Sequence, residues 1–154
     1  QALYVAAGVV VVQEGDTQLH HFQGHDDDVL CMDVSDDGKL VATGQVGHTG
    51  NACICIWDAI YCEKEVKIDV PRHGGIYAVS FKAAQGHTPM FLASIANDED
   101  STIHLWDLRQ GLPNVKLLTS IAGDTKRVLT VAWNPFYSGD IFGSLVTCGD
   151  KHLN

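Results

Sequence analysis

Apolar residues along this chain alternate with polar ones or run in short blocks, which is typical of β-strands. Gly, Asp, Asn and Pro bound the blocks. No stretch shows the 3.6-residue period of an amphipathic helix, so we predict an all-β fold. The expected strands are residues 3–12, 18–22, 29–34, 39–44, 53–58, 64–70, 76–81, 91–95, 102–107, 115–121, 128–133 and 144–148.

The same order of motifs occurs twice along the chain. A glycine and a histidine open each unit, at Gly24-His25 and at His73-Gly74, and three short apolar stretches follow. A Trp-Asp pair closes each unit, at Trp57-Asp58 and at Trp106-Asp107, and an incomplete third copy begins at Gly123-Asp124. A repeated unit that closes on Trp-Asp is the sequence signature of a four-stranded propeller blade.

This repeat predicts a WD-repeat β-propeller fragment of about three blade equivalents, each with four antiparallel strands. Residues 1–23 are expected to form the outer half of a blade, and residues 24–70 and 71–121 one blade each. Residues 122–154 are expected to form the first half of another blade. Within the first complete unit, Asp36-Asp37-Gly38 predicts a tight hairpin turn, because glycine readily adopts a positive φ angle.

Side chains that form hydrogen bonds recur at matching places in the two complete units. A histidine, a hydroxyl residue, an Asp or Asn and the tryptophan can form one chain across a blade. A buried indole N–H needs an acceptor, and a buried polar network stabilises only when all its groups are satisfied. We therefore interpret these residues as structural rather than catalytic. They are His25, Thr43, Asn51 and Trp57 in the first unit, and His73, Ser94, Asp100 and Trp106 in the second.

The sequence contains no motif that predicts an enzyme. A serine hydrolase needs an exposed nucleophile and an oxyanion hole, and the sequence lacks a nucleophile-elbow motif. The glycines within residues 44–50 lack the Lys-Ser/Thr pair of a phosphate-binding loop. We therefore expect no catalytic residue and no cofactor.

The cysteines and histidines raise the alternative of a metal site. Cys53 and Cys55 lie two residues apart on one strand face, but the paired CxxC spacing of structural zinc sites is missing. We expect buried, reduced thiols, because five cysteines without framework spacing and without a secretory signal indicate a reducing compartment. We interpret His20 and His21 as residues at a strand end and His25 as a scaffold residue. The acidic run Asp26-Asp27-Asp28 is interpreted as a loop, because it lacks the spacing of a calcium-binding loop. We expect no metal.

The charge of the chain restricts its partners. The net charge is −9 and the Lys and Arg residues are scattered, whereas a nucleic-acid groove needs a basic stripe. No apolar run is long enough to span a membrane. Because the chain begins with Gln1, we expect it to be excised from a longer protein. We therefore expect protein partners, and neither nucleic acid nor membrane.

Some stretches are more specific than the general blade pattern. They are Tyr4-Val5-Ala6-Ala7-Gly8-Val9-Val10, His21-Phe22-Gln23-Gly24-His25, Ala42-Thr43-Gly44-Gln45-Val46 and Val146-Thr147-Cys148-Gly149-Asp150-Lys151-His152-Leu153. With these stretches the whole chain resembles the first propeller of the echinoderm microtubule-associated-protein-like (EMAP-like) family of WD-repeat proteins. The resemblance implies a cytoplasmic, cytoskeletal scaffold that engages tubulin. In that family a basic, coiled-coil amino-terminal region carries much of the microtubule binding, and this chain has no such region.

Two functional interpretations are open at this point. The first is a piece of a microtubule-associated, EMAP-like scaffold. The alternative is a WD-repeat adaptor in a cilium or a signalling pathway that does not contact tubulin. The predicted half-blades also expose strand edges, which favour association. We therefore expect a two-fold dimer in which residues 145–148 of one copy pair with residues 3–7 of another.

Overall fold

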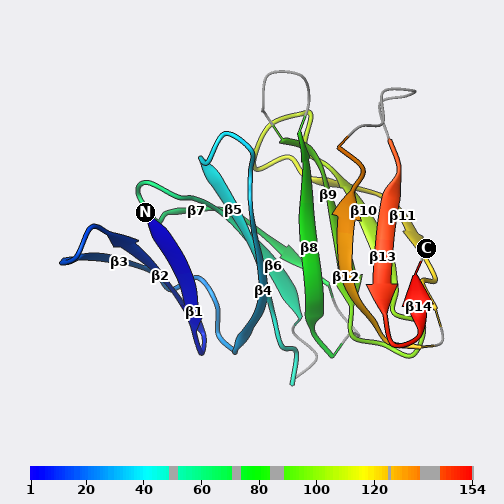
Figure 1. The fold of residues 1–154 in the computed structure, drawn as a ribbon. Coiled ribbons are helices and arrows are strands. Elements are labelled where there is room, and N and C mark those ends of the chain that lie inside the picture. The colour runs from blue at the N-terminus through cyan, green and yellow to red at the C-terminus, as the bar shows by residue number, and fades with distance from the viewer. Residues whose placement is uncertain (49–51, 71–73, 84–88, 125, 136–142, 154) are drawn as a thin grey trace.

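The computed structural model describes residues 1–48, 52–70, 74–83, 89–124, 126–135 and 143–153. In these residues the elements are all β-strands, and they form four antiparallel sheets that follow one another along the chain (Figure 1). The prediction of an all-β fold made of blade-like sheets is therefore confirmed. Within the same ranges, no helix has the length and apolarity needed to cross a membrane.

The two middle sheets are complete blades of four strands, in which each strand pairs with its neighbours in the sequence. The second sheet consists, in order, of β4 (Val29–Val34), β5 (Leu40–Gln45), β6 (Cys53–Asp58) and β7 (Lys64–Asp69). The third consists of β8 (Ile76–Ala83), β9 (Pro89–Ala96), β10 (Ile103–Asp107) and β11 (Lys116–Ile121). This up-and-down order is the arrangement expected of a propeller blade.

Among the described residues, the first and last sheets have three strands each. The first contains β1 (Ala2–Ala6), β2 (Val9–Glu14) and β3 (Gln18–Phe22). The last contains β12 (Val128–Trp133), β13 (Leu145–Gly149) and β14 (His152–Leu153).

The single strand expected over residues 3–12 is wrong. The structure has a hairpin there, in which Ala6 pairs with Val9 and Ala7 adopts a φ of 53°. Apolar residues flank this turn on both sides, and Gly8 within it is the local signal that marks it. Residues 1–23 therefore contribute one strand more than the sequence analysis assumed.

The pairing expected between copies stays a prediction, and the structure restricts it at one end. β13 pairs with β12 over its whole length, whereas β14 pairs only with Cys148 and Gly149. Cys148 is therefore already paired on the edge that the expected contact with residues 3–7 of another copy would use. Within the described residues, β1 pairs with β2 alone and has an open edge on its other side.

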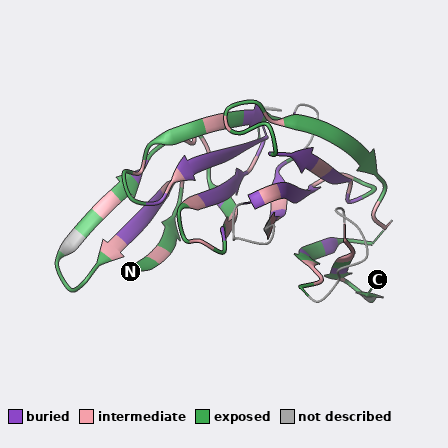
Figure 2. Cartoon of the chain, turned by 90° about the horizontal axis from the view of Figure 1, so that it is seen from above, coloured by how far each residue is buried: buried purple, intermediate pink, exposed green. Residues whose placement is uncertain are grey.

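Apolar side chains fill the space between successive sheets. Phe22 of β3 and Trp57 of β6 belong to the cluster between the first two sheets, and both are buried. A second cluster joins the second and third sheets, and a third cluster joins the third and last sheets. The outermost strand β11 is exposed along its whole length, whereas β9 in the same sheet is almost entirely buried. Seen from above, the buried segments occupy the middle of the row of sheets (Figure 2).

The turn between β4 and β5 forms as predicted. Gly38 has a φ of 70°, and its N–H donates to the carbonyl of Ser35 at 2.8 Å. The Asp37 carboxylate accepts a hydrogen bond of 2.7 Å from the Ser35 hydroxyl and another of 3.1 Å from the Lys39 N–H. The side chains and the glycine together close the hairpin.

Candidate functional site

A hydrogen-bond network crosses the second sheet and is centred on the hydroxyl of Thr43. The indole Nε1–H of Trp57 donates to Thr43 Oγ1 at 3.2 Å, and Thr43 Oγ1 lies 2.7 Å from His25 Nε2. Thr43 and Trp57 are fully buried, on β5 and β6, and His25 lies in the loop before β4. The structure therefore brings together three of the residues that the sequence analysis singled out.

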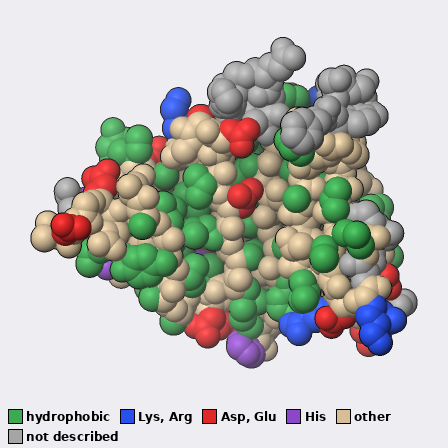
Figure 3. Space-filling view, viewed as in Figure 1, with side chains coloured by type: hydrophobic (Ala, Val, Ile, Leu, Met, Phe, Trp, Pro, Cys, Tyr) green, Lys and Arg blue, Asp and Glu red, His purple; other side chains and the backbone are tan. Residues whose placement is uncertain are grey.

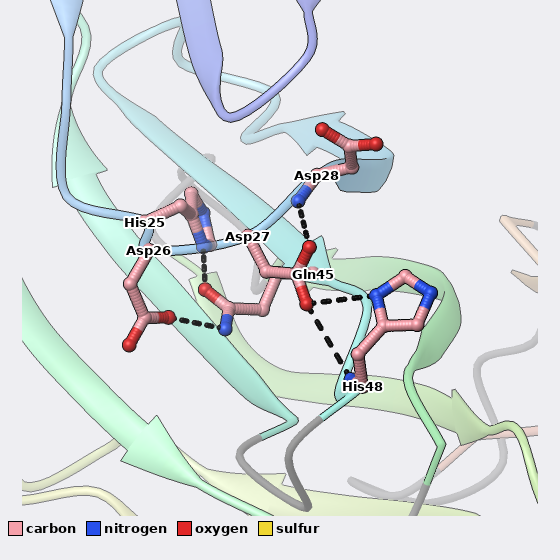
Figure 4. Close-up of polar contacts among 6 residues, drawn as sticks. All are labelled: His25, Asp26, Asp27, Asp28, Gln45 and His48. Carbon is pink, nitrogen blue, oxygen red and sulfur yellow. Dashed lines mark hydrogen bonds and ion pairs between the residues drawn. The ribbon is translucent and has the colours of Figure 1, made fainter.

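The network continues from His25 toward the surface (Figure 4). His25 Nδ1 lies 2.7 Å from Gln45 Oε1, and Gln45 Nε2 donates to Asp26 Oδ1 at 2.6 Å. With a neutral imidazole protonated on Nδ1, the groups form a directed chain in which Trp57 donates to Thr43 and Thr43 to His25. His25 then donates to Gln45, and Gln45 donates to the carboxylate. This assignment gives each of these side chains a partner.

Two acidic side chains of the loop before β4 have specific partners. The hydrogen bond from Gln45 holds the pKa of Asp26 below its usual value. The Asp28 N–H, followed by the His48 side chain, lowers the pKa of Asp27. Asp27 Oδ1 accepts from the Asp28 N–H at 2.9 Å, and its Oδ2 lies 3.0 Å from His48 Nδ1. Asp26 and Asp27 therefore attach this loop to the end of β5 and to the residues after it. The sequence analysis had interpreted the acidic run only as a loop.

Gln45 and Asp26 were not among the predicted network residues. Gln45 is 1% exposed and lies two residues after Thr43 on β5, so both side chains point to the same face of the strand. That spacing is the signal that would have identified Gln45. The predicted Asn51 and His73 both lie outside the described residues.

In the third sheet, the structure brings Ser94 and Trp106 together. Trp106 Nε1–H donates to Ser94 Oγ at 2.9 Å, and both side chains are buried. Asp100 is exposed, and in the described part of the chain its hydrogen bonds are made by the main-chain carbonyl. That carbonyl accepts from the Gly123 N–H at 2.9 Å and from the Asp124 N–H at 3.2 Å, which links the third sheet to the loop before β12.

A stacked pair of aromatic rings supports the network from the side of the first sheet. The rings of Phe22 and Trp57 are nearly parallel, at an angle of 5°, and their centroids are 4.5 Å apart. A Cβ on Gly24 would lie 2.3 Å from the Phe22 ring. The glycine before His25 therefore makes room for the ring that covers Trp57, a contact that the repeat pattern did not reveal.

Polar contacts also join neighbouring sheets. The Phe81 N–H on β8 donates to Asp33 Oδ2 on β4 at 2.7 Å, and burial raises the pKa of Asp33. Trp133 Nε1–H on β12 donates to the Ser80 carbonyl on β8 at 3.0 Å. The first strands of three successive sheets are thus connected by hydrogen bonds as well as by apolar packing.

Two buried thiols lie beside the imidazole of the network. The five cysteines are free, and Cys53 and Cys55 on β6 are fully buried. Their Sγ atoms lie 3.9 Å and 4.0 Å from His25 Nδ1. The hydrogen bond between the two thiols lowers the pKa of Cys55, and the same contact followed by burial raises the pKa of Cys53.

We expect Thr43→Val to lower the free energy of unfolding by about 1–3 kcal/mol. Valine keeps the shape of threonine but leaves the indole N–H of Trp57 and the Nε2 of His25 without the hydroxyl that both contact. Urea unfolding followed by circular dichroism measures the change. Thr43→Ser is the matched control, because it retains the hydroxyl. Equal midpoints for Thr43→Val and the original chain would show that the hydroxyl contributes nothing.

Comparisons with known proteins agree with this architecture. A family model described as "WD domain, G-beta repeat" matches residues 16–58, which extend from the turn before β3 to the end of β6. In a solved structure titled "Crystal Structure of Mitotic Checkpoint Complex", one chain superposes with a TM-score of 0.67. The match covers 97% of this chain and 42% of that one at 20% identity, so it supports the fold alone.

Proteins that are similar in sequence indicate a narrower group than the structural match does. Echinoderm microtubule-associated protein-like 1 of Homo sapiens is 27% identical over 99% of this chain and 18% of its own length. Echinoderm microtubule-associated protein-like 3 of Homo sapiens is 31% identical over 87% of this chain and 15% of its own length. Cilia- and flagella-associated protein 52 of Homo sapiens is 29% identical over 69% of this chain and 17% of its own length.

The chain therefore spans less than a fifth of these relatives. Three observations indicate WD-repeat blades. They are the four-stranded sheets, the hydrogen bonds from Trp57 to Thr43 and from Trp106 to Ser94, and the match to the repeat model. This chain is a WD-repeat β-propeller fragment that is similar, over nearly its whole length, to the echinoderm microtubule-associated protein-like proteins.

Proposed function

We propose that this chain is part of a non-catalytic scaffold of the cytoplasmic cytoskeleton, in a protein that binds tubulin. The observation that carries the proposal is the similarity to two EMAP-like proteins over 99% and 87% of the chain. The site supports the scaffold role, because His25, Thr43 and Trp57 satisfy one another inside the sheet. Such groups stabilise the blade and leave its loops and edges for partners.

The test uses the complete translation product that contains these residues. We expect it to co-sediment with stabilised microtubules at physiological salt. A version that lacks residues 1–154 shows whether this segment contributes to binding. Failure of the complete protein to co-sediment, even at low salt, would contradict the proposal.

The 154-residue chain on its own is expected to bind microtubules weakly. It carries 19 acidic and 10 basic residues, and a tubulin lattice also presents an acidic surface, so long-range electrostatics oppose encounter. On the face drawn in Figure 3, the Lys and Arg side chains that are shown lie in small separate groups with acidic side chains close by. Co-sedimentation of the purified chain measures this. Strong binding that falls steeply with added salt would contradict the expectation.

An adaptor without tubulin contact is the second candidate function. The observation in its favour is the similarity to cilia- and flagella-associated protein 52. Proximity labelling in ciliated cells separates the two candidates. An adaptor is expected to label neighbours in the cilium, and its purified form is expected to remain in the supernatant when microtubules are pelleted.

We further infer that the isolated chain associates with itself through the open edge of β1. An unpaired strand edge is a template for another strand, and Tyr4 and Val5 on β1 are exposed. Light scattering is expected to give a mass above the 16.7 kDa of one chain. Val5→Lys places a charge on this strand and should lower that mass. A monodisperse monomer at all concentrations would contradict the inference.

A further inference from the structure

We propose that His25, Cys53 and Cys55 form a binding site for one thiophilic divalent cation of the zinc type. The ligand atoms of the three residues all lie within 4.8 Å of one another, and both thiols are fully buried. The paired CxxC spacing is missing from the sequence. In the fold, His25, from a loop 28 residues earlier than Cys53, lies beside the two cysteines and provides the third ligand atom.

The distances are close to those that a tetrahedral ion requires. With Zn–S bonds of about 2.3 Å and Zn–N bonds of about 2.0–2.1 Å, ligand atoms are separated by about 3.6–3.8 Å. The two Sγ atoms lie 3.9 Å and 4.0 Å from His25 Nδ1. Shifts of a few tenths of an ångström therefore bring each Sγ to its required distance from Nδ1. The two Sγ atoms lie within 4.8 Å of each other and must approach by at most about 1 Å. Gln45 Oε1, which lies 2.7 Å from Nδ1, must withdraw to admit the ion, and three protein ligands leave the fourth position of the tetrahedron to a water molecule.

The charge of a divalent cation is balanced by the two thiolates of the proposed site. A Zn²⁺ ion that binds both thiols displaces one proton from each, and two thiolates with a neutral imidazole give a site of zero net charge. A neutral site avoids the large cost of burying an uncompensated ion. His25 is partly exposed, and the neighbouring Asp26 is at the surface, so the loop before β4 provides the route of entry.

The existing network already supplies the outer contacts of such a site. A histidine that binds a metal through one ring nitrogen usually donates its other N–H to an acceptor, which fixes the ring. His25 Nε2 lies 2.7 Å from Thr43 Oγ1, which then accepts this N–H. The Thr43 hydroxyl proton turns toward the Cys55 carbonyl, 3.4 Å away, and the oxygen still accepts from Trp57. Metal binding thus replaces the hydrogen bond from His25 Nδ1–H to Gln45 and reverses the one between His25 and Thr43, while Trp57 keeps its acceptor.

Cobalt titration of the reduced, chelator-treated chain tests the site. Exposed Cys148 is replaced first, and Cys148→Ala serves as the background and matched control. We expect one equivalent of Co²⁺ to produce thiolate-to-cobalt absorption bands that Zn²⁺ abolishes. Adding Cys53→Ala or Cys55→Ala, which suit a buried apolar position, is expected to remove the bands.

A second measurement avoids dependence on the variants. In the original chain, Zn²⁺ above its dissociation constant is expected to raise the urea midpoint with the logarithm of its concentration, whereas Mg²⁺ is expected to leave it unchanged. Absence of thiolate bands in the folded Cys148→Ala chain would overturn the proposal. Bands that persist in both folded double variants would overturn it as well. Neither result depends on microtubule binding.

Discussion

Trp57→Ala is expected to lower the free energy of unfolding by about 3–5 kcal/mol. Trp57 is fully buried, and its ring stacks on Phe22 of the neighbouring sheet, so alanine leaves a cavity between β3 and β6. The substitution also removes the indole N–H that donates to Thr43. Urea unfolding followed by circular dichroism measures the loss. Hydrogen exchange is expected to quicken most in β2 and β3, because their apolar side chains share this cluster.

Trp57→Phe separates packing from hydrogen bonding. It retains a ring that can stack on Phe22 and loses only the N–H, so its effect should be clearly smaller than that of alanine. A negligible shift in the urea midpoint for Trp57→Ala would contradict the buried position of the indole.

Trp106→Ala is expected to produce a loss of similar size, about 3–5 kcal/mol, at a different boundary. Trp106 is 6% exposed and packs in the cluster between the second and third sheets, together with Ile54 and Leu92. Its N–H donates to the buried hydroxyl of Ser94. Hydrogen exchange should therefore quicken in β6 and β9, whereas the first sheet should keep its protection.

Combining the two tryptophan substitutions gives a further check on this assignment. Because the indoles lie in separate clusters, their effects on the free energy of unfolding should be nearly additive. Exchange that quickens in the same strands for both variants would contradict the division into two boundaries.

Local patterns in the sequence were sufficient for the architecture. The short apolar blocks and the two Trp-Asp pairs predicted the sheets, because strand periodicity and turn residues act over a few positions. Gly38 illustrates this, since its positive φ is a local property of the hairpin. The turn at Ala7 was not predicted because a single glycine, Gly8, within an apolar run also fits a continuous strand with a bulge, whereas in the structure Val9 pairs back to Ala6.

The site was predictable only in part. Thr43 and Trp57 were identified because their places in the repeat are fixed, and the structure shows their hydrogen bond. Gln45 and Asp26 were not identified, since the repeat pattern does not specify which polar group completes the network beyond His25. The structure gives the exposed Asp100 a main-chain link to the next sheet.

The sequence by itself determined most of the strands, the repeat and the likeness to EMAP-like proteins, because these depend on residue order alone. Only the tertiary structure decided which side chains meet across sheets. The Phe22–Trp57 stack joins residues of different sheets, and the approach of His25 to Cys53 and Cys55 joins a loop to a strand. Such contacts depend on how twisted sheets pack face to face, and this packing brings together residues that no fixed spacing in the sequence connects.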